Sequence, residues 1–217
     1  MDKDYWTEYY KLNVAPIEPS NFAKDTLPII LNHNTSREDI TLLELGCGNG
    51  RDCVFFAQNG ISVIAIDQSD EIQNLKSSHY KCGNLNFIQD NFITFRDYLQ
   101  SQFNCIYSRF TLHSIREDEE NVMIKNAYNA LFENGIFLIE VRSVKDNIFG
   151  KGIPANGERN AYIYENHYRR FIELEEMIQK LQVTGFNILY SEEKSGFAPY
   201  KEENPIVIRI IAEKIIS

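Results

Sequence analysis

Short apolar runs and segments with helix signals alternate along the first two thirds of the chain. The apolar runs have the length of buried strands, and they predict strands at 41–46, 61–67, 84–89, 103–108 and 135–142. The segments around them predict helices over 21–32, 50–59, 69–78, 92–101 and 117–132. We expect Ser20 to cap the first helix and Pro28 to disturb it. The alternation of strand and helix is typical of a parallel sheet covered by helices.

The remaining third of the chain follows a different pattern. Residues 143–166 contain three glycines and a proline, and the segment is much longer than the usual connection of about 2–6 residues. We therefore expect a functional loop, inserted ahead of a helix over 167–183. The runs 186–194 and 205–214 are separated by turn-forming residues, and they predict an antiparallel pair of strands at a sheet edge.

Composition is typical of a globular protein with one domain. The chain has 217 residues, of which 43% are hydrophobic, enough for one domain spanning 1–217. Its formal net charge of −9 argues against nucleic-acid binding, which needs a basic face. No apolar run reaches the roughly 18 residues that span a bilayer, and the start lacks the pattern of a signal peptide, so we expect a cytoplasmic protein without membrane insertion. The four cysteines form no CxxC pair, which predicts free thiols and no metal site.

A glycine-rich turn follows the first predicted strand and leads into a helix. Its residues are Gly46, Cys47, Gly48, Asn49 and Gly50. Glycines let the backbone pack against a ligand, and the helix N-terminus offers free N–H donors. Asp67 ends the second strand, where a carboxylate accepts hydrogen bonds from the two ribose hydroxyls of a nucleoside cofactor. The alternatives are a tight turn without a ligand, and an acid that only caps a helix.

These motifs resemble those of the class I S-adenosylmethionine-dependent methyltransferases. The matching segments are ELGCGNG after the first strand, the acid in IAIDQS, and the acid and aromatic residue in IQDNF after the third strand. The resemblance covers roughly residues 20–217. It implies an α/β, Rossmann-like doubly wound sheet of seven strands, mostly parallel with an antiparallel last strand, and helices on both faces. It also implies S-adenosylmethionine as the cofactor and S-adenosylhomocysteine as its product.

The resemblance assigns cofactor roles to single residues. Around the methionine part it implies Glu44 and the turn 46–50, with Asp52 either receiving the ammonium group or complementing the helix dipole. Asp67, with Gln68 beside it, would hold the ribose. The residues implied at the adenine and beside the transferable methyl are Asp90, Asn91, Phe92, Ser108 and Arg109. The alternative for Phe92 is ordinary core packing.

Candidate acceptor residues follow the fourth and fifth strands. His113 lies in the loop after the fourth strand, where a general base is needed, and a neutral imidazole can take a hydroxyl proton. Glu140, near the end of the fifth strand, is the second candidate base. The predicted acceptor-binding residues are Arg142, Lys151, His167, Arg169 and Tyr9. Structural roles are the alternatives: a helix cap for His113, ion pairing for Glu140 and Arg142, and a solvated helix start for Arg169.

Aromatic residues near the N-terminus share one helical face. Tyr5, Trp6, Tyr9 and Tyr10 have the spacing of such a face. They predict either core packing or a helical lid within residues 1–40. A lid that excludes water would help to align the methyl donor with its acceptor.

The predicted function is O-methylation of a small polar or anionic acceptor. His113 and Glu140 are available as bases, and several arginines can orient such a molecule. The chain is also similar to bacterial enzymes that methylate sugars or phosphorylated building blocks of surface polysaccharides, which implies that acceptor class. The alternatives are N-methylation of another small molecule, RNA or protein, and a non-catalytic nucleotide-binding subunit. The expected partner is a small molecule and not a nucleic acid, and the expected state is a monomer or homodimer.

Overall fold

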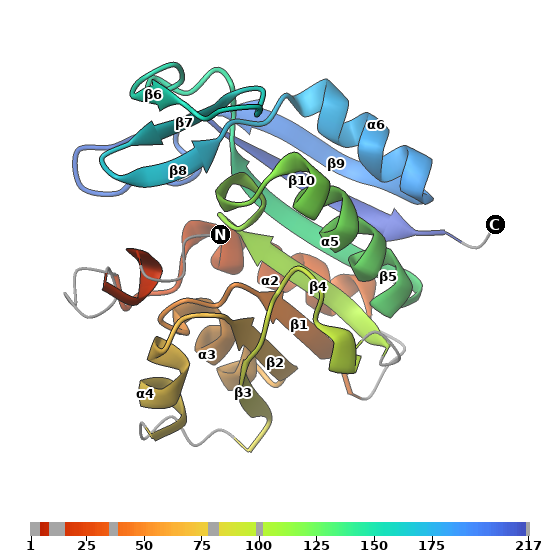
Figure 1. The fold of residues 1–217 in the computed structure, drawn as a ribbon. Coiled ribbons are helices and arrows are strands. Elements are labelled where there is room, and N and C mark those ends of the chain that lie inside the picture. Colours follow the sequence, from red (N-terminus) through yellow and green to blue (C-terminus); the bar gives the residue numbers. More distant parts are fainter. Residues whose placement is uncertain (1–4, 9–15, 35–38, 78–82, 99–101, 216–217) are drawn as a thin grey trace.

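A seven-stranded sheet forms the centre of the protein (Figure 1). The computed structural model describes residues 5–8, 16–34, 39–77, 83–98 and 102–215. The strands of the sheet are β1 (Thr41–Leu45), β2 (Ser62–Asp67), β3 (Leu85–Gln89), β4 (Phe103–Arg109), β5 (Leu131–Arg142), β9 (Phe186–Lys194) and β10 (Val207–Lys214). Their spatial order is β3-β2-β1-β4-β5-β10-β9, and β10 is antiparallel to both of its neighbours. The predicted doubly wound sheet with a reversed last strand is confirmed.

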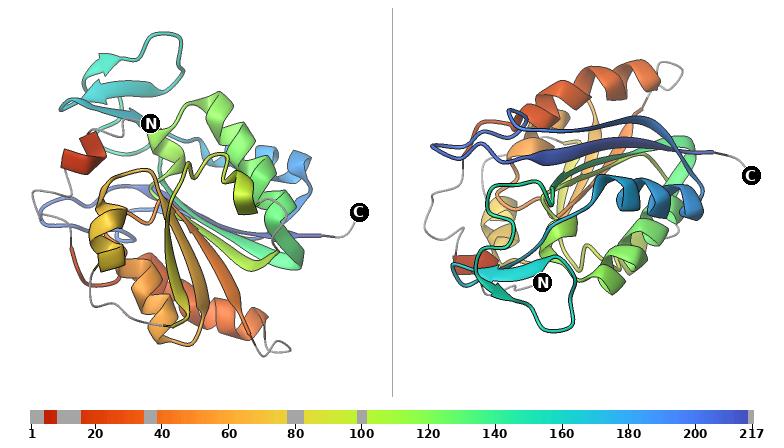
Figure 2. Two further views of the ribbon diagram at one scale, coloured as in Figure 1. Left: turned by 60° about the horizontal axis from the view of Figure 1, so that its bottom comes forward. Right: turned by 90° about the horizontal axis from the view of Figure 1, so that it is seen from above.

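Helices cover both faces of this sheet. They are α2 (Asn21–His33), α3 (Arg51–Gln58), α4 (Glu71–Ser77), α5 (Glu117–Ala130) and α6 (Leu174–Thr184). One apolar core lies between the sheet and the helices α2, α3 and α4, and the other lies between the sheet and α5 and α6. The right view of Figure 2 shows α2 on one side of the sheet and α5 and α6 on the other. None of the helices in the described part of the chain is long and apolar enough to cross a membrane.

Helix α2 begins as predicted but continues through its proline. The Ser20 side chain accepts a hydrogen bond from the backbone N–H of Ala23 at 3.1 Å, which makes Ser20 the N-cap. Pro28 lies inside the helix and was expected to disturb it. The helix persists because Phe22, Ala23 and Ile30 are buried against the sheet, so the packing of one face outweighs the missing N–H of a single residue.

The prediction of a helix over 92–101 is wrong. Residues Arg96–Tyr98 form only a 3₁₀ turn, η1, and residues 99–101 lie outside the described part of the chain. The side chain of Asn91 accepts a hydrogen bond from the N–H of Ile93 at 2.8 Å. Such a local side-chain bond offers the backbone an alternative to a helix at this point.

A second, smaller sheet forms from parts of the expected loop 143–166 and the residues that follow it. Its strands are β6 (Ile153–Pro154), β7 (Ala161–Tyr164) and β8 (His167–Arg170), which pair antiparallel in that order. The turn between β7 and β8 consists of Glu165 and Asn166, whose φ angles of 52° and 56° match a type I′ hairpin. The helix expected from residue 167 is therefore wrong in its first part, because a hairpin forms there and α6 begins only at Leu174.

Candidate functional site

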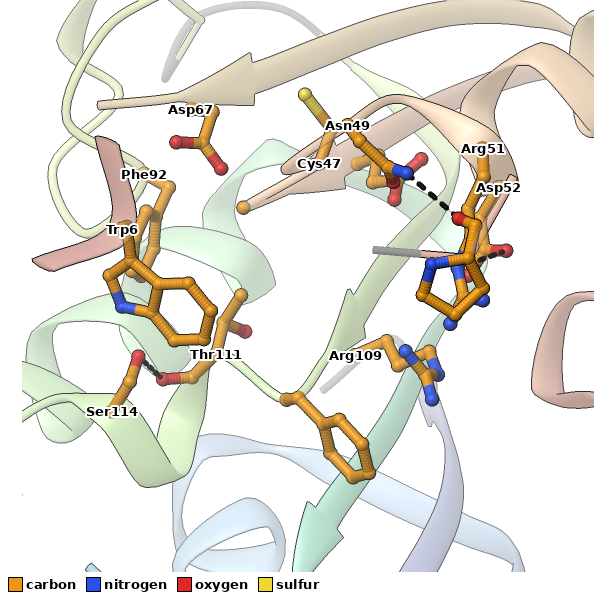
Figure 3. Close-up of a pocket in the computed structure, with 14 residues that line it drawn as sticks. Trp6, Cys47, Asn49, Arg51, Asp52, Asp67, Phe92, Arg109, Thr111 and Ser114 are labelled. Atoms are coloured by element: carbon orange, nitrogen blue, oxygen red, sulfur yellow. Dashed lines mark hydrogen bonds and ion pairs between the residues drawn. The ribbon is translucent and has the colours of Figure 1, made fainter. Parts of the chain in front are cut away.

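Most of the predicted cofactor residues meet where the carboxyl ends of β1, β2 and β4 come together. A cavity open to solvent lies there, which we call the first cavity. Ligands of α/β sheets bind at this end of the strands, at the point where the strand order reverses. Figure 3 shows Trp6, Phe92 and Thr111 on one side of the first cavity and Asn49 and Asp52 on the other.

The predicted cofactor residues divide into two groups. Those that line the first cavity are Glu44, Gly46, Cys47, Asn49, Asp52, Asp67, Phe92 and Arg109. Those that do not line it are Gly48, Gly50, Gln68, Asp90, Asn91 and Ser108. Ser108 lies fully buried below the cavity and is hydrogen-bonded to Thr111. Asp90 accepts a hydrogen bond from the N–H of the neighbouring Asn91 at 2.6 Å.

The glycine-rich turn needs its glycines for both conformation and space. Gly46, Gly48 and Gly50 have φ angles of 76°, 55° and 79°, which side chains rarely tolerate. A Cβ atom at Gly46 would lie 2.1 Å from the Thr111 side chain. The N–H groups of Gly46 and Cys47 donate to the carbonyl of Ile66, which holds the turn over the end of β2.

The carboxylate of Asp67 is fixed by two backbone groups. One oxygen accepts from the N–H of Gly48 and the other from the N–H of Ser69, each at 2.8 Å. A carboxylate oxygen can accept more than one hydrogen bond, so both oxygens keep capacity for a ligand. The side chain is therefore buried, held in place and able to accept from two neighbouring hydroxyl groups.

Glu44 is a buried carboxylate with an unused oxygen. Its Oε2 atom has no hydrogen-bond partner among the described residues, although the side chain lines the first cavity. Burial raises the pKa of Glu44 well above its ordinary value, and the negative charge of Asp52 raises it further. A buried acceptor without a partner is costly, so this oxygen is a position where a cationic or N–H-bearing ligand group can bind.

Asp52 holds the chain segment that precedes α2. Its two oxygens accept from the N–H and the hydroxyl of Ser20, both at 2.7 Å, and from the hydroxyl of Tyr107 at 2.9 Å. Neighbouring residues of the same turn bind the same segment. Asn49 donates to the carbonyl of Pro16 at 2.8 Å, and Arg51 donates to the carbonyl of Glu18 at 3.2 Å. These three side chains thus attach residues 16–20 to the rim of the first cavity, a role that neither prediction for Asp52 contained.

A second cavity, which is also open to solvent, adjoins the first. Both are bordered by Trp6, Pro16, Arg51, Arg109 and Phe110. The second cavity brings together the candidate base His113 and three of the predicted acceptor-binding residues, which are Arg142, His167 and Arg169. They come from the 3₁₀ turn η2 (Leu112–Ser114), the end of β5, and β8, so the small sheet supplies one wall of the site. Lys151 is exposed and lines neither cavity, and Tyr9 lies outside the described residues.

His113 is buried in the wall of the second cavity. Its Nδ1 atom accepts a hydrogen bond from the backbone N–H of Arg142 at 3.4 Å. Burial lowers the pKa of His113 well below its ordinary value. The positive groups that lower it further are Arg142, His167, Arg169 and Arg170. The ring is therefore neutral at pH 7.

Glu140 lies between two arginines. Its oxygens accept from Nε of Arg109 at 2.9 Å and from Nε of Arg209 at 2.7 Å, and the carboxylate lines neither cavity. Burial raises the pKa of Glu140. Arg209 also pairs with Asp25 of α2 at 2.7 Å. This chain of charges holds the guanidinium of Arg109 at the border between the two cavities.

Phe110 lines both cavities and is a site residue that the sequence did not predict. Phe110 has a φ angle of 59°, which is unusual for a residue other than glycine, and its ring lies 4.3 Å below the guanidinium of Arg109. Near it, the ring of Tyr5 stacks on His167 at 4.2 Å, and Trp6 borders both cavities. Tyr5 and Trp6 thus pack against the site, and Tyr9 and Tyr10 lie outside the described residues. No local sequence pattern predicts the backbone of Phe110.

Residues 20–191 match the family model of a methyltransferase domain. The chain belongs to this methyltransferase family. It is 27% identical over 169 residues to a Geobacillus sp. (strain WCH70) protein described as a methyltransferase. That match covers 74% of this chain, and the chain spans 65% of the length of the Geobacillus relative.

Two solved structures share the fold of this methyltransferase domain. One is an S-adenosylmethionine-dependent methyltransferase from Methanosarcina mazei, with a TM-score of 0.74 and 20% identity over 88% of this chain and 98% of the other. The second is the 1,6-didemethyltoxoflavin-N1-methyltransferase of Burkholderia thailandensis, bound to its substrate and S-adenosylhomocysteine. It has a TM-score of 0.65 and 20% identity over 90% of this chain and 79% of the other. The predicted family and fold are thereby confirmed.

S-adenosylmethionine fits the residues of the first cavity. Its ammonium group would give the unpartnered oxygen of Glu44 a donor, and its ribose hydroxyls would meet the fixed carboxylate of Asp67. Phe92, buried at the same cavity, would lie against the adenine. The cofactor that the sequence implies is the one that these solved relatives use.

Proposed function

We propose that this chain is an S-adenosylmethionine-dependent O-methyltransferase of a small polar or anionic acceptor. The observation that carries the proposal is the pair of adjoining cavities. The first presents the carboxylates of Glu44 and Asp67, and the second presents basic side chains. Arg109 and Phe110 border both cavities, so a methyl group carried in one can face an acceptor held in the other.

The side chains act on binding and orientation. When bound, S-adenosylmethionine supplies an electrophilic methyl group on a positively charged sulfur. Glu44 would hold its ammonium group and Asp67 would hold its ribose hydroxyls. These two contacts would fix the direction of the methyl group. Trp6 covers the border of the cavities and excludes water there. In-line displacement needs mainly such alignment, because well-oriented reactants gain about 7–11 kcal/mol over free encounter. The proton that a hydroxyl acceptor loses as the methyl group binds its oxygen passes to solvent, to which the second cavity is open.

Charge at the second cavity favours an anionic or polyhydroxyl acceptor. The cationic residues that line it are Lys24, Arg51, Arg109, Arg142 and Arg169, and the acidic ones are Glu18, Glu165 and Glu203. This local excess of positive charge contrasts with the net charge of −9 of the whole chain. The acceptor class that we propose is a sugar or phosphorylated building block of surface polysaccharide, acted on in the cytoplasm.

A nitrogen acceptor is the second candidate. The Burkholderia protein of the same fold is named as an N1-methyltransferase and holds 1,6-didemethyltoxoflavin. Aromatic side chains at the second cavity, which include Trp6 and Phe110, offer flat apolar contacts of the kind that a ring compound uses. This candidate keeps the cofactor site and changes only the acceptor atom.

The test is methyl transfer from labelled S-adenosylmethionine into a metabolite extract, with the product bond located by mass spectrometry and NMR. Label on oxygen of a sugar or phosphorylated compound supports the proposal, and label on nitrogen supports the second candidate. Calorimetry with S-adenosylmethionine, S-adenosylhomocysteine and NAD accompanies it. Binding of the two sulfur compounds without transfer to any extract would indicate a non-catalytic subunit. Tight binding of NAD alone would overturn the cofactor site.

A further inference from the structure

The hydrogen bond to His113 determines which of its ring nitrogens carries the proton. A backbone N–H can only donate, so the bond from Arg142 to Nδ1 requires a lone pair on Nδ1. In a neutral imidazole the proton is then on Nε2. His113, which lines the second cavity, therefore has an N–H donor at Nε2, and its one lone pair on Nδ1 is engaged by Arg142 and cannot take a proton.

Arg169 brings to the same cavity a positive charge that no ion pair among the described residues neutralises, although the carboxylates of Glu165 and Glu203 line the cavity as well. Its guanidinium donates to the carbonyl of Tyr164 at 3.0 Å and has no ion pair among the described residues. The neighbouring Arg142 differs, because its guanidinium pairs with Asp146 and with Glu203, each at 3.0 Å. Burial lowers the pKa of Arg169, and the charge of Arg142 lowers it further. A partly buried cation without a counter-ion attracts an anionic ligand.

We propose that His113 and Arg169 form an oxyanion subsite, in which a carboxylate or phosphate group of the acceptor receives hydrogen bonds from His113 Nε2–H and from the Arg169 guanidinium. This inference rests on the proposed function and deepens it. His113 then recognises the acceptor as a donor and does not act as the general base that the sequence predicts.

The position of the subsite separates recognition from methyl transfer. His113 and Arg169 line the second cavity and not the first, whereas Arg109 and Phe110 line both. An anionic group held by His113 and Arg169 thus lies on the second-cavity side of the border, next to Phe110, whose ring centroid is 5.1 Å from that of His113. The atom that accepts the methyl group belongs to another part of the same acceptor, turned toward Arg109.

Nitrogen NMR of the protein bound to S-adenosylhomocysteine tests the tautomer. The protein is labelled with ¹⁵N-histidine, and the His113→Gln variant identifies the resonances of His113 among the four histidines. We expect a proton on Nε2 and a lone pair on Nδ1 at pH 7. A proton on Nδ1, or a doubly protonated ring, would overturn the proposal.

Small anions test the subsite in the same sample. Acetate and inorganic phosphate are the probes, with acetamide as the neutral control and potassium chloride at matched ionic strength. At least one anion should shift the His113 Nε2–H resonance in a saturable way, and the one that binds more tightly distinguishes a carboxylate from a phosphate ligand. Arg169→Met should weaken this binding at least tenfold. The matched control is Arg159→Met, which removes an exposed arginine paired with Glu176 and should leave it unchanged.

Failure of this inference and of the proposed function can be told apart. Undiminished S-adenosylhomocysteine binding with no response of His113 to either anion would overturn the oxyanion subsite and leave the methyltransferase proposal standing. Equal anion binding by wild type and Arg169→Met would do the same. Absence of S-adenosylhomocysteine binding in the wild type would count against the proposed function itself.

Discussion

Replacing Glu44 with glutamine should stabilise the unliganded protein and weaken its binding of the cofactor. Burial raises the pKa of Glu44 above its ordinary 4.5, with the charge of Asp52 as the second cause. The folded state therefore binds more protons than the unfolded state once the pH exceeds about 4.5, and stability falls as pH rises toward the folded-state pKa. An amide does not titrate, so Glu44→Gln should lack this loss.

The effect on binding follows from the hydrogen bond that the cofactor's ammonium group would make to Glu44. Hydrogen bonds to charged groups contribute about 1.5–3 kcal/mol, which corresponds to roughly 10- to 150-fold in Kd. Calorimetry with S-adenosylmethionine and S-adenosylhomocysteine measures this loss for both compounds. Urea unfolding at about pH 5 and about pH 8 measures the gain in stability. Glu133→Gln is the matched control, because Glu133 is exposed and lines neither cavity.

Two results would refute the reasoning. Equal affinity of wild type and Glu44→Gln for S-adenosylmethionine would show that its ammonium group does not meet the unpartnered oxygen. An equal fall in stability between the two pH values in both proteins would show that the raised pKa does not belong to this carboxyl. Burial also raises the pKa of Glu140, but that residue is present in both proteins and its contribution cancels from the difference.

Three further changes have defined outcomes. Asp67→Ala should weaken binding of S-adenosylmethionine and its product by more than tenfold in calorimetry, because the ribose hydroxyls lose their acceptor; an unchanged Kd would contradict the ribose assignment. Shortening 150–158 to a tight turn should raise the acceptor KM or lower kcat and leave cofactor affinity unchanged, since the segment lines neither cavity but precedes the hairpin that supplies His167 and Arg169. Wild-type kinetics would show that it has no part in acceptor binding. Burial lowers the pKa of His113, so below about pH 6.5 the unfolded state binds a proton that the folded state does not. The free energy of unfolding should therefore decrease as the pH is lowered below about 6.5. In urea unfolding, this fall should be smaller in His113→Gln.

Local patterns were sufficient to predict the strands of the sheet and several residues that line the first cavity, whose roles toward the cofactor stay predictions. Buried strands produce continuous apolar runs, and a strand, a glycine turn and a helix with Asp67 at the next strand end all lie within one short stretch of sequence. The hairpin β7–β8 was missed because its turn, Glu165-Asn166, lacks the glycine that usually marks a type I′ turn.

Long-range partners explain what the sequence did not reveal. Asp52 was assigned to the cofactor or the helix dipole, yet it binds Ser20, which lies 32 residues earlier in the chain. Glu140 was a candidate base, and its two arginine partners come from β4 and β10. A local pattern shows that a residue is acidic, but only the sheet order determines which cations lie beside it.

The ion pairs of Glu140 limit how the border between the cavities can evolve. Removing one member of such a buried set leaves an unpaired charge and costs about 3–5 kcal/mol, a large part of the stability of a typical domain. Arg109, Glu140 and Arg209 lie on three strands, so acceptable change at any of them requires compensation on another strand. In related sequences these three positions should therefore change together and not one at a time. An engineered replacement of Arg109 requires redesign of all three.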